Sequence, residues 1–389
     1  MNNSFSVLFL TSWYPTPEYP THGIFIRNHA KALSRYCNVI VLYVYSSKEI
    51  KSIELEHTQT GNLNEYVLAF PKSSIPILKN FIHLFKYYYY YYKLSHLAKK
   101  HFKNIKFAQI NVIYPFGLFF PIIRKIFKIN HYTIFEQWTG YLKEDNLYKG
   151  LLQKTVTKYL IKNASKTWCL CQQQKDAMIQ NGLNGAYEIL GNIVNTEVFK
   201  PSEKIKSDKK TFIHISTLDD RQKNISGILR TFATLEKEGY DFNLIIIGGK
   251  EDYLQNAQNI TKKLGLKNIS FKGILSQEEL VKYYQLADAL VMFSNYETFC
   301  VVIYEALSCG TYVISTDVAD VKNIIQNSCG EIIPIKDEIA LKNAILKVLH
   351  SNKSLCDADK AHQLIQQNFS EKVIGQKLYN YYQQLYQLS

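Results

Sequence analysis

The second half of the chain alternates short apolar runs with stretches in which apolar residues recur every three to four positions. Buried strands are predicted for FIHIS (212–216), LIIIGG (244–249), ISFKG (269–273), LVMF (290–293) and YVIST (312–316). Helices are predicted for 226–239, 252–264 and 299–308, and Ser276 with Glu279 forms a capping box for one more. Strand, helix, strand at this spacing predicts right-handed βαβ units and a parallel sheet covered on both faces.

The first half follows the same alternation less regularly. A helix is predicted from Ile24 to Arg35, and strands are predicted near 7–11, 38–44, 109–114 and 132–135. The stretch 185–201 lacks periodicity and ends in Pro201, and a lysine-rich polar run, 203–210, follows it. We therefore place a domain junction near residue 200.

Three segments result: an N-terminal domain (1–200), a C-terminal domain (201–370) and a final helix (371–389). That helix carries an aromatic stripe that must pack on another surface, for which the first domain is a candidate; the stripe is Tyr379, Tyr382 and Tyr386. The fold class expected is α/β, with two Rossmann-like domains whose parallel sheets face each other across a cleft. Such sheets bind ligands at the carboxyl ends of their strands.

Charge narrows the class of partner. The formal net charge is +13, which favours anions such as nucleotides, phosphates, nucleic acid or acidic lipid. No nucleic-acid recognition motif accompanies the charge, so we expect no nucleic-acid partner.

Cysteine usage and hydropathy bear on location. The seven cysteines contain no C-x-x-C pair, and the C-x-C of Cys169 and Cys171 fits neither a zinc nor a disulfide framework, so reduced thiols are expected. The opening run VLFLTSWYP (7–15) has no basic leader or cleavage site, and no apolar stretch reaches about 18 residues. These features predict a cytoplasmic protein, at most peripheral at the inner face of a membrane.

The segment SNYETFCVVIYEALSCG (294–310) places two carboxylates in a mostly apolar run. Glu297 is expected in the loop after strand 290–293, with Thr298 as the N-cap of a helix from about Phe299 to Ser308 and Gly310 at the left-handed position that terminates it. Eight residues of helix rotate about 800°, which leaves Glu297 and Glu305 about 80° apart and able to face one cleft. The amide groups of Thr298, Phe299 and Cys300 would favour an anion at the helix start. Spacing alone leaves a solvated loop residue and a partly exposed helix residue as the alternative.

With its context, this segment resembles the E-x7-E signature of the retaining family 4 glycosyltransferases, which have the GT-B fold. GNIVNTEVFKP (191–201), WYPTPEYPTHGIF (13–25), SFKG (270–273) and LADALVMFS (286–294) resemble other stretches of that family, in family order. The resemblance implies that Glu297 contacts donor-sugar hydroxyls and that Glu305 contacts the nucleotide ribose.

The resemblance also implies which residues bind the phosphates of the donor. Lys223, in DDRQKN (219–224), matches the family lysine that neutralises the leaving phosphate, and Arg221 is a weaker candidate for the same task. The alternative for Lys223 is an ordinary surface lysine. The donor site is completed by the amides of Thr298, Phe299 and Cys300 and by three glycines, Gly23, Gly248 and Gly273.

The chain departs from the family pattern at two positions. Thr217 stands where many members have an arginine, and EQWTGY (136–141) has Gln137 where many have a histidine that orients the donor sugar. Glutamine can hydrogen-bond but cannot carry a proton, so Gln137 keeps at most the orienting part of a catalytic role. No cofactor or metal is expected, and the D-x-D match at 357–359 is interpreted as chance, since it lies in a polar helical region.

A basic, aromatic-rich segment is the last feature. Between Glu65 and Glu136 there are eleven Lys and Arg residues and no acidic residue, and the segment 77–106 includes KYYYYYYK (86–93). Lysines at positions 79, 86, 93 and 100 share one helix face, as in helices that lie on anionic membrane surfaces. The alternative is that the tyrosines pack on the sheet of their own domain and the lysines face solvent.

The function expected from these features is retaining, metal-independent transfer of a sugar from a nucleotide-diphosphate donor to a glycan or lipid-linked acceptor in surface polysaccharide assembly. Two alternatives remain open: a nucleotide-sugar epimerase of the same fold, and a non-catalytic relative that binds anions or membranes.

Overall fold

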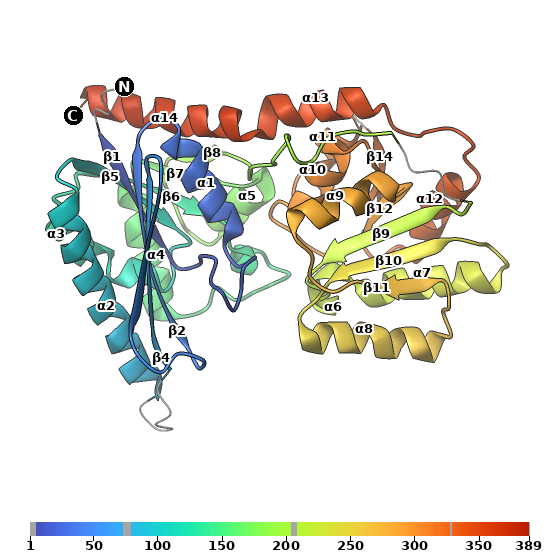
Figure 1. The fold of residues 1–389 in the computed structure, drawn as a ribbon, viewed down its shortest axis with the longest axis horizontal. Coiled ribbons are helices and arrows are strands. Elements are labelled where there is room, and N and C mark those ends of the chain that lie inside the picture. Colours follow the sequence, from blue (N-terminus) through green and yellow to red (C-terminus); the bar gives the residue numbers. More distant parts are fainter. Residues whose placement is uncertain (1–4, 73–78, 204–207, 327–328, 389) are drawn as a thin grey trace. The chain divides into compact units, whose positions relative to one another are not determined.

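The computed structural model describes residues 5–72, 79–203, 208–326 and 329–388, and the chain divides into two compact units (Figure 1). Unit 1 comprises Met1–Leu170, Gln174–Ile193 and Glu371–Ser389, and unit 2 comprises Cys171–Gln173 and Val194–Ser370. The division after Ile193 lies seven residues before the junction placed near 200, and the C-terminal helix is part of unit 1.

Unit 1 is built on a sheet in which eight strands are described, in the order β3-β4-β2-β1-β5-β6-β7-β8. All neighbours pair in parallel except the edge pair β3 and β4, which is antiparallel. The strands are β1 (Ser6–Thr11), β2 (Asn38–Ser47), β3 (Glu54–Thr60), β4 (Leu63–Pro71), β5 (Ile105–Asn111), β6 (His131–Glu136), β7 (Lys166–Cys169) and β8 (Tyr187–Ile189).

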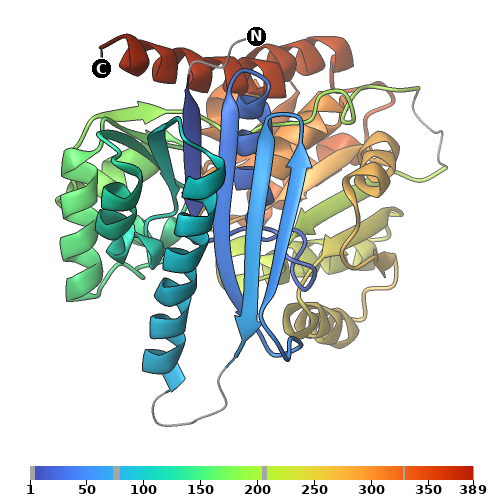
Figure 2. The same ribbon diagram turned by 60° about the vertical axis from the view of Figure 1, so that its left-hand side comes forward.

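Helices cover both faces of this sheet. The helices are α1 (Ile24–Ser34), α2 (Lys79–His101), α3 (Phe120–Phe127), α4 (Leu151–Asn163), α5 (Gln172–Gln180) and α14 (Glu371–Leu388), with short 3-10 turns at Phe116–Leu118 and Thr139–Tyr141. The strand order runs one way from β1 to β2 and the other way from β5 to β8, so right-handed crossovers place α1 on one face and the layer that begins with α2 and α3 on the other (Figure 2). α14 packs against α1.

The aromatic stripe of α14 packs into unit 1. Tyr382 is fully buried, where it shares a hydrogen bond of 2.6 Å with Thr133 and donates one of 3.0 Å to the side-chain oxygen of Gln109. A side chain on Gly375 would come within 2.6 Å of the carbonyl oxygen of Ala32, so glycine permits the close contact between α14 and α1.

Unit 2 is built on a parallel sheet in which six strands are described, in the order β11-β10-β9-β12-β13-β14. The strands are β9 (Thr211–Ser216), β10 (Asn243–Gly248), β11 (Ile269–Phe271), β12 (Ala289–Met292), β13 (Tyr312–Thr316) and β14 (Gly330–Ile333). The helices are α6 (Asp220–Lys223), α7 (Ile225–Lys237), α8 (Glu251–Leu264), α9 (Gln277–Leu286), α10 (Val301–Ser308), α11 (Val321–Gln326), α12 (Glu338–Leu349) and α13 (Ala358–Phe369).

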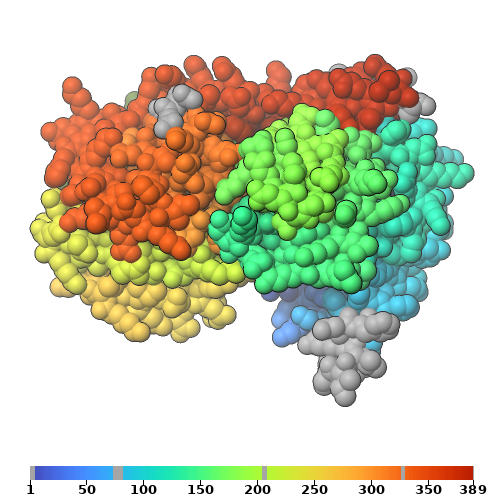
Figure 3. Space-filling model, turned by 180° about the vertical axis from the view of Figure 1, so that it is seen from behind, coloured from blue at the N-terminus to red at the C-terminus, as the bar shows by residue number. Residues whose placement is uncertain are grey.

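The strand order of unit 2 reverses between β9 and β12. The chain leaves β9 toward β10 and β11, and then returns to place β12 on the other side of β9. Right-handed crossovers therefore put α7 and α8 on one face, where α12 joins them (Figure 3), and α9 and α10 on the other. The carboxyl ends of β9 and β12 flank this reversal, which is where open α/β sheets hold their ligands.

The expected architecture of two α/β domains with parallel sheets is confirmed, with local corrections. The strand expected at 109–114 is β5, Ile105–Asn111, because Val112 takes a left-handed conformation (φ 58°) that ends it. Four strands of unit 1 were not predicted: β3, β4, β7 and β8. Part of the lysine-rich run at 203–210, residues 204–207, lies outside the described residues.

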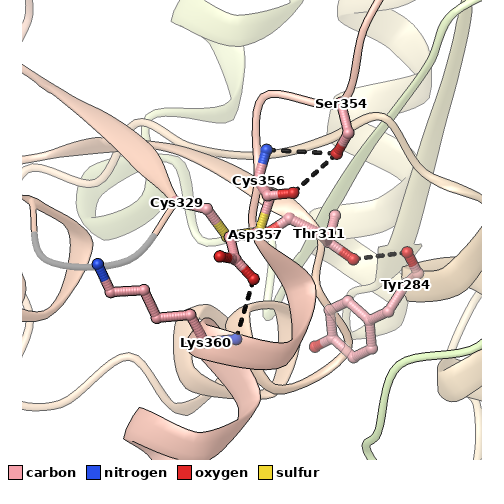
Figure 4. The surroundings of a disulfide bond; sticks show 7 residues. All are labelled: Tyr284, Thr311, Cys329, Ser354, Cys356, Asp357 and Lys360. Carbon is pink, nitrogen blue, oxygen red and sulfur yellow. Dashed lines mark hydrogen bonds between the residues drawn. A yellow bond between two sulfur atoms is a disulfide. The ribbon is translucent and has the colours of Figure 1, made fainter.

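The expectation that all thiols are reduced is wrong for one pair. Cys329 and Cys356, whose Cα atoms are 4.6 Å apart, form a disulfide that joins the start of β14 to the start of α13 (Figure 4). Asp357 next to it caps α13 by accepting a hydrogen bond of 3.1 Å from the amide of Lys360. The two cysteines lie 27 residues apart in no recognisable motif, so the sequence carries no signal for their pairing.

In the part of the chain that the structure describes, no helix is both long and apolar enough to cross a membrane.

Candidate functional site

The first side of the site is the loop after β9, which the sheet holds through a buried histidine. His214 donates from Nδ1 to the carbonyl oxygen of Val291 on β12 (2.8 Å), and its Nε2 lies 2.7 Å from the hydroxyl of Ser216. That hydroxyl accepts a hydrogen bond of 3.0 Å from the amide of Leu218. Burial lowers the pKa of His214 to about 4, so the ring is neutral and the network needs no counter-charge.

The loop then enters the short helix α6. Asp219 caps α6 by accepting a hydrogen bond of 3.1 Å from the amide of Arg221, and Asn224 ends it in the left-handed region (φ 49°). Lys223 is the last residue of α6. The Asp219 cap and the left-handed Asn224 therefore fix the backbone on both sides of the short helix that carries the Lys223 side chain.

The second side of the site is the loop after β12, which carries Glu297. The loop is tied to the first by two hydrogen bonds from Asn295: its amide donates to the carbonyl of Gln222 (2.7 Å) and its side chain to the carbonyl of Arg221 (2.8 Å). The two loops at the strand-order reversal therefore form one hydrogen-bonded structure.

Lys223 and Glu297 meet there in an ion pair. The Glu297 carboxylate also accepts hydrogen bonds from Ser294 Oγ (3.0 Å) and from Gln222 Nε2 (3.2 Å). The side chains are 12 % exposed for Lys223 and 6 % for Glu297, so each charge is largely removed from water and needs the other.

The electrostatics keep Lys223 charged. Burial by itself lowers the pKa of a lysine, but the surrounding negative charge, chiefly the Glu297 carboxylate, more than offsets this, and the pKa of Lys223 is raised above its ordinary value. The site thus presents a permanent cation beside a carboxylate at the carboxyl edge of a parallel sheet. Such a pair can bind an anion on one side and hydroxyl groups on the other.

The helix after Glu297 starts later than expected. α10 begins at Val301, and its N-cap is Cys300 in a left-handed conformation (φ 53°), so the prediction of Thr298 as N-cap is wrong. Phe299, just before the helix, stacks on Tyr304 within it, with ring centroids 4.2 Å apart. Thr298, Phe299 and Cys300 are all buried in the turn that leads into α10, and Gly310 follows the helix in a left-handed conformation, as predicted.

Glu305 lies inside the unit. It is 6 % exposed and accepts a hydrogen bond of 2.8 Å from the hydroxyl of the fully buried Tyr284. Burial raises the pKa of Glu305 to about 7, against 4.5 for an ordinary glutamate. The pKa of the Cys300 thiol is raised mainly by burial and further by the negative charges of Glu297 and Glu305. The thiol therefore lies close enough to both carboxylates to feel their charge.

This raised pKa makes stability depend on pH. The folded state holds the Glu305 proton more tightly than the unfolded chain, so the contribution of Glu305 to the free energy of unfolding falls as the pH rises from 4.5 to 7. Glu305→Gln removes this effect, and we expect the stability of the variant relative to the wild type to rise by about 2–3 kcal/mol between pH 5 and pH 8. Denaturant unfolding at several pH values measures it.

The matched control is Glu278→Gln, at an exposed position in the first turn of α9. Its stability relative to the wild type is expected to vary little over the same range. A flat difference for Glu305→Gln as well would contradict the raised pKa.

Two of the predicted glycines meet at the ends of β10 and β11. The amide of Gly248 donates a hydrogen bond of 2.6 Å to the carbonyl of Gly273. A side chain on Gly248 (φ 99°) would come within 2.2 Å of the carbonyl oxygen of Ser216, so glycine is required there for the backbone to pass the end of β9. Gly273 (φ 66°) faces open space, and its requirement is conformational.

Gly23 and Gln137 belong to unit 1. Gly23 is the left-handed N-cap of α1 (φ 71°), and a side chain there would come within 2.6 Å of the backbone of Trp13. Gln137 is a buried residue directly after β6, and its backbone amide donates a hydrogen bond of 2.9 Å to the carboxylate of Glu136.

Glu136 organises the loop that contains Gln137. This fully buried carboxylate also accepts hydrogen bonds from the amides of Ile113 (3.2 Å) and Trp138 (3.1 Å) and from the hydroxyl of Tyr141 (3.1 Å). Burial raises its pKa, which the hydrogen bonds partly offset. The glutamate of EQWTGY is therefore a positioning residue that the sequence-based assignment passed over.

The structure brings some of the predicted residues together and leaves others apart. Lys223 and Glu297 are in contact, whereas Arg221 and Thr217 beside them are exposed. Sequence reasoning missed the residues that hold the pair, Gln222 and Ser294, and the partner of Glu305, Tyr284. Gln222 and Ser294 sit one and three residues from the predicted ones, and that proximity is the signal that could have found them.

Within the described ranges, no group of three His, Cys, Asp or Glu side chains is placed to hold a metal ion.

Comparison with known proteins places this site in a family context. Residues 195–369, which cover nearly all of unit 2, match the family model described as "Glycosyl transferases group 1". A curated relative from Thermosipho melanesiensis, described as "Probable sucrose-phosphate synthase", is 27 % identical over 225 residues, which cover 54 % of this chain and 52 % of the relative. The chain spans about half the length of the curated relatives it matches.

Solved structures match over nearly the whole chain. Sucrose-phosphate synthase from Thermosynechococcus elongatus has a TM-score of 0.79 at 19 % identity, covering 99 % of this chain and 100 % of the other. HepE from Anabaena, solved in complex with UDP and glucose, has a TM-score of 0.72 at 17 % identity, covering 98 % and 100 %. The chain therefore has the GT-B fold, and its residues 195–369 match the glycosyl transferases group 1 family.

Proposed function

We propose that the chain is a retaining glycosyltransferase that moves a sugar from a nucleotide-diphosphate donor to a hydroxyl of a glycan or lipid-linked acceptor. The observation that carries the proposal is the Lys223–Glu297 ion pair, which lies between two hydrogen-bonded loops at the strand-order reversal of unit 2. The family match of the same unit and the UDP and glucose in the HepE structure support a nucleotide-sugar donor.

Lys223 would serve the leaving group. As the bond between the sugar C1 and the phosphate oxygen breaks, its electron pair stays on that oxygen, and a positioned ammonium stabilises the growing charge. The amide groups at the start of α10 add the positive end of a helix dipole beside it. Protein groups therefore supply positive charge here, and we propose that the step needs no metal.

Glu297 would serve the sugar. Its carboxylate is an acceptor only, which suits donor-sugar hydroxyls, and Ser294 and Gln222 hold it in place. The acceptor hydroxyl then attacks C1 on the face that the diphosphate leaves, and its proton passes to the departing phosphate oxygen. Attack on that face retains the anomeric configuration.

The remaining predicted residues take supporting roles. Glu305 would bind the nucleotide ribose, Gln137 would orient the donor sugar, and Gly23, Gly248 and Gly273 would let backbone approach the donor. Arg221, Thr298, Phe299 and Cys300 would line the phosphates. The acceptor class we propose belongs to surface polysaccharide assembly at the inner face of the cytoplasmic membrane.

The test is a panel of nucleotide sugars, starting with UDP-sugars, scored first by thermal shift and then by transfer to glycan and lipid-linked acceptors. We expect one donor to raise the unfolding temperature and to give a product whose anomeric configuration, read by NMR, equals that of the donor. Inversion would contradict the retaining mechanism. Isomerisation of the donor without acceptor would indicate an epimerase, and binding without turnover across the panel would indicate a non-catalytic relative.

A further inference from the structure

Three helices of unit 1, α2, α3 and α4, cover one face of its sheet, and we call their outer surface the basic helical face (Figure 2). The three helices carry ten Lys and Arg residues and no Asp or Glu; the basic residues are Lys79, Lys86, Lys93, Lys99, Lys100, Arg124, Lys125, Lys154, Lys158 and Lys162. A solvated helix surface ordinarily carries both signs of charge, so this face is one-sided.

Acidic residues in the connecting segments do little to neutralise it. Between Glu65 and Asp176 the acidic residues are Glu136, Glu144 and Asp145. Glu136 is fully buried, and Asp145 is buried and accepts a hydrogen bond of 2.6 Å from Thr139. Glu144 alone of the three is exposed.

The same face exposes large apolar side chains. The tyrosine run of α2 is divided between core and surface: Tyr87 and Tyr91 are buried, whereas Tyr89 and Tyr92 are exposed. With Phe85, which is 66 % exposed, these two make a line at spacings of four and three residues along α2. The exposed set of the three helices is Leu84, Phe85, Tyr89, Tyr92, Ile122, Leu151, Leu152 and Tyr159.

A pocket of about 440 Å³ opens between α3 and α4. Three basic residues line it, Arg124, Lys125 and Lys128, together with the aromatic rings of Tyr132 and Tyr159. Arg124 is held by donating to the carbonyls of Ile129 (2.9 Å) and Asn130 (3.2 Å). The basic helical face therefore includes a concave, positively charged site next to its exposed apolar residues.

We propose that the basic helical face docks on an anionic lipid bilayer. In this arrangement the lysines reach headgroup phosphates, and the aromatic and aliphatic side chains between them enter the headgroup layer. Either the electrostatic or the apolar interaction alone would bind the membrane weakly, so the two act together. A nucleic acid would complement the positive charge of the face, but it would not cover the apolar side chains of Leu151 and Leu152, which are 82 % and 58 % exposed. These apolar residues therefore favour lipid over nucleic acid as the partner. The proposed membrane docking does not depend on whether the chain transfers a sugar.

The test is sedimentation of the full chain with vesicles of phosphatidylcholine alone or with about a third phosphatidylglycerol. The charge variant is Lys93→Glu/Lys100→Glu/Lys125→Glu, all exposed on the face. The matched control is Lys237→Glu/Lys262→Glu/Lys263→Glu, exposed on α7 and α8 of unit 2, with the same change in net charge. We expect the charge variant to bind anionic vesicles at least about tenfold more weakly than the wild type, and the control to stay within about twofold.

A second variant separates lipid from nucleic acid. Phe85→Ser/Leu151→Ser keeps every charge, and we expect it to lose about threefold or more in vesicle binding while its binding to a single-stranded oligonucleotide is unchanged. Unfolding temperatures within a few degrees of the wild type show that the variants fold. Wild-type protein that ignores anionic vesicles, equal weakening by both charge variants, or no effect of Phe85→Ser/Leu151→Ser would overturn the proposal; the last result, with tight oligonucleotide binding, would indicate nucleic acid instead.

Discussion

Replacing Glu297 with alanine is expected to abolish sugar transfer while leaving unit 2 folded. The substitution removes the acceptor for donor-sugar hydroxyls and leaves Lys223 buried without its counter-charge. The loop itself keeps its hydrogen bonds from Asn295 to the backbone of residues 221 and 222, so its course should persist. The measurement is turnover with the donor identified in the panel, beside the unfolding temperature.

Two further variants interpret the loss. Glu278→Ala makes the same chemical change at an exposed site of unit 2 and should keep wild-type activity. Glu297→Gln keeps the shape and an acceptor oxygen but loses the charge, and we expect it to retain a small part of the activity. Wild-type turnover by Glu297→Ala, with any donor that the wild type uses, would refute the role of Glu297.

Replacing Lys223 with alanine is expected to lower kcat by about 100- to 1000-fold, equivalent to about 3–4 kcal/mol of transition-state stabilisation. The reason is that charge on the leaving phosphate grows as the glycosidic bond breaks, so the ammonium contributes more to the transition state than to the bound donor. KM for the donor should therefore change much less than kcat. Steady-state kinetics on the two proteins make the comparison.

The defect has a signature that a purely structural role lacks. A sugar donor with a better leaving group than a nucleoside diphosphate, such as a glycosyl fluoride, should reduce the gap between Lys223→Ala and wild type. Lys262→Ala, at an exposed position of α8, is the matched control and should behave as the wild type. A gap that is the same for both donors would show that Lys223 only holds Glu297 in place.

Much of unit 2 could be predicted because its central strands, β9, β10, β12 and β13, are mostly buried on both faces. A strand such as β10, NLIIIG, is an apolar run that ends at glycine, and the capping box at Ser276 marks the start of α9 directly. The edge strand β3, ELEHTQT, was missed because it is exposed along its length and carries no apolar run. The start of α10 was misplaced because the left-handed conformation of Cys300, a non-glycine residue, begins the helix at Val301, and propensity gives no signal for such a conformation.

The candidate site was predictable in its members but not in its contacts. The spacing and family resemblance singled out Lys223 and Glu297, which lie 74 residues apart, and only the strand-order reversal brings their loops together. The structure buries both Glu297 and Glu305, and the hydrogen bond that Glu305 accepts from Tyr284 could not be read from the spacing. Burial of a single side chain depends on its neighbours in space, and periodicity does not report those.

The most direct measurement is a crystal structure of the full chain with a bound nucleotide-diphosphate sugar or a non-hydrolysable analogue. We expect the diphosphate to lie at the start of α10 within hydrogen-bonding distance of Lys223 Nζ, with a sugar hydroxyl donating to the Glu297 carboxylate. A diphosphate bound elsewhere, or a Glu297 side chain that makes no contact with the sugar, would contradict it.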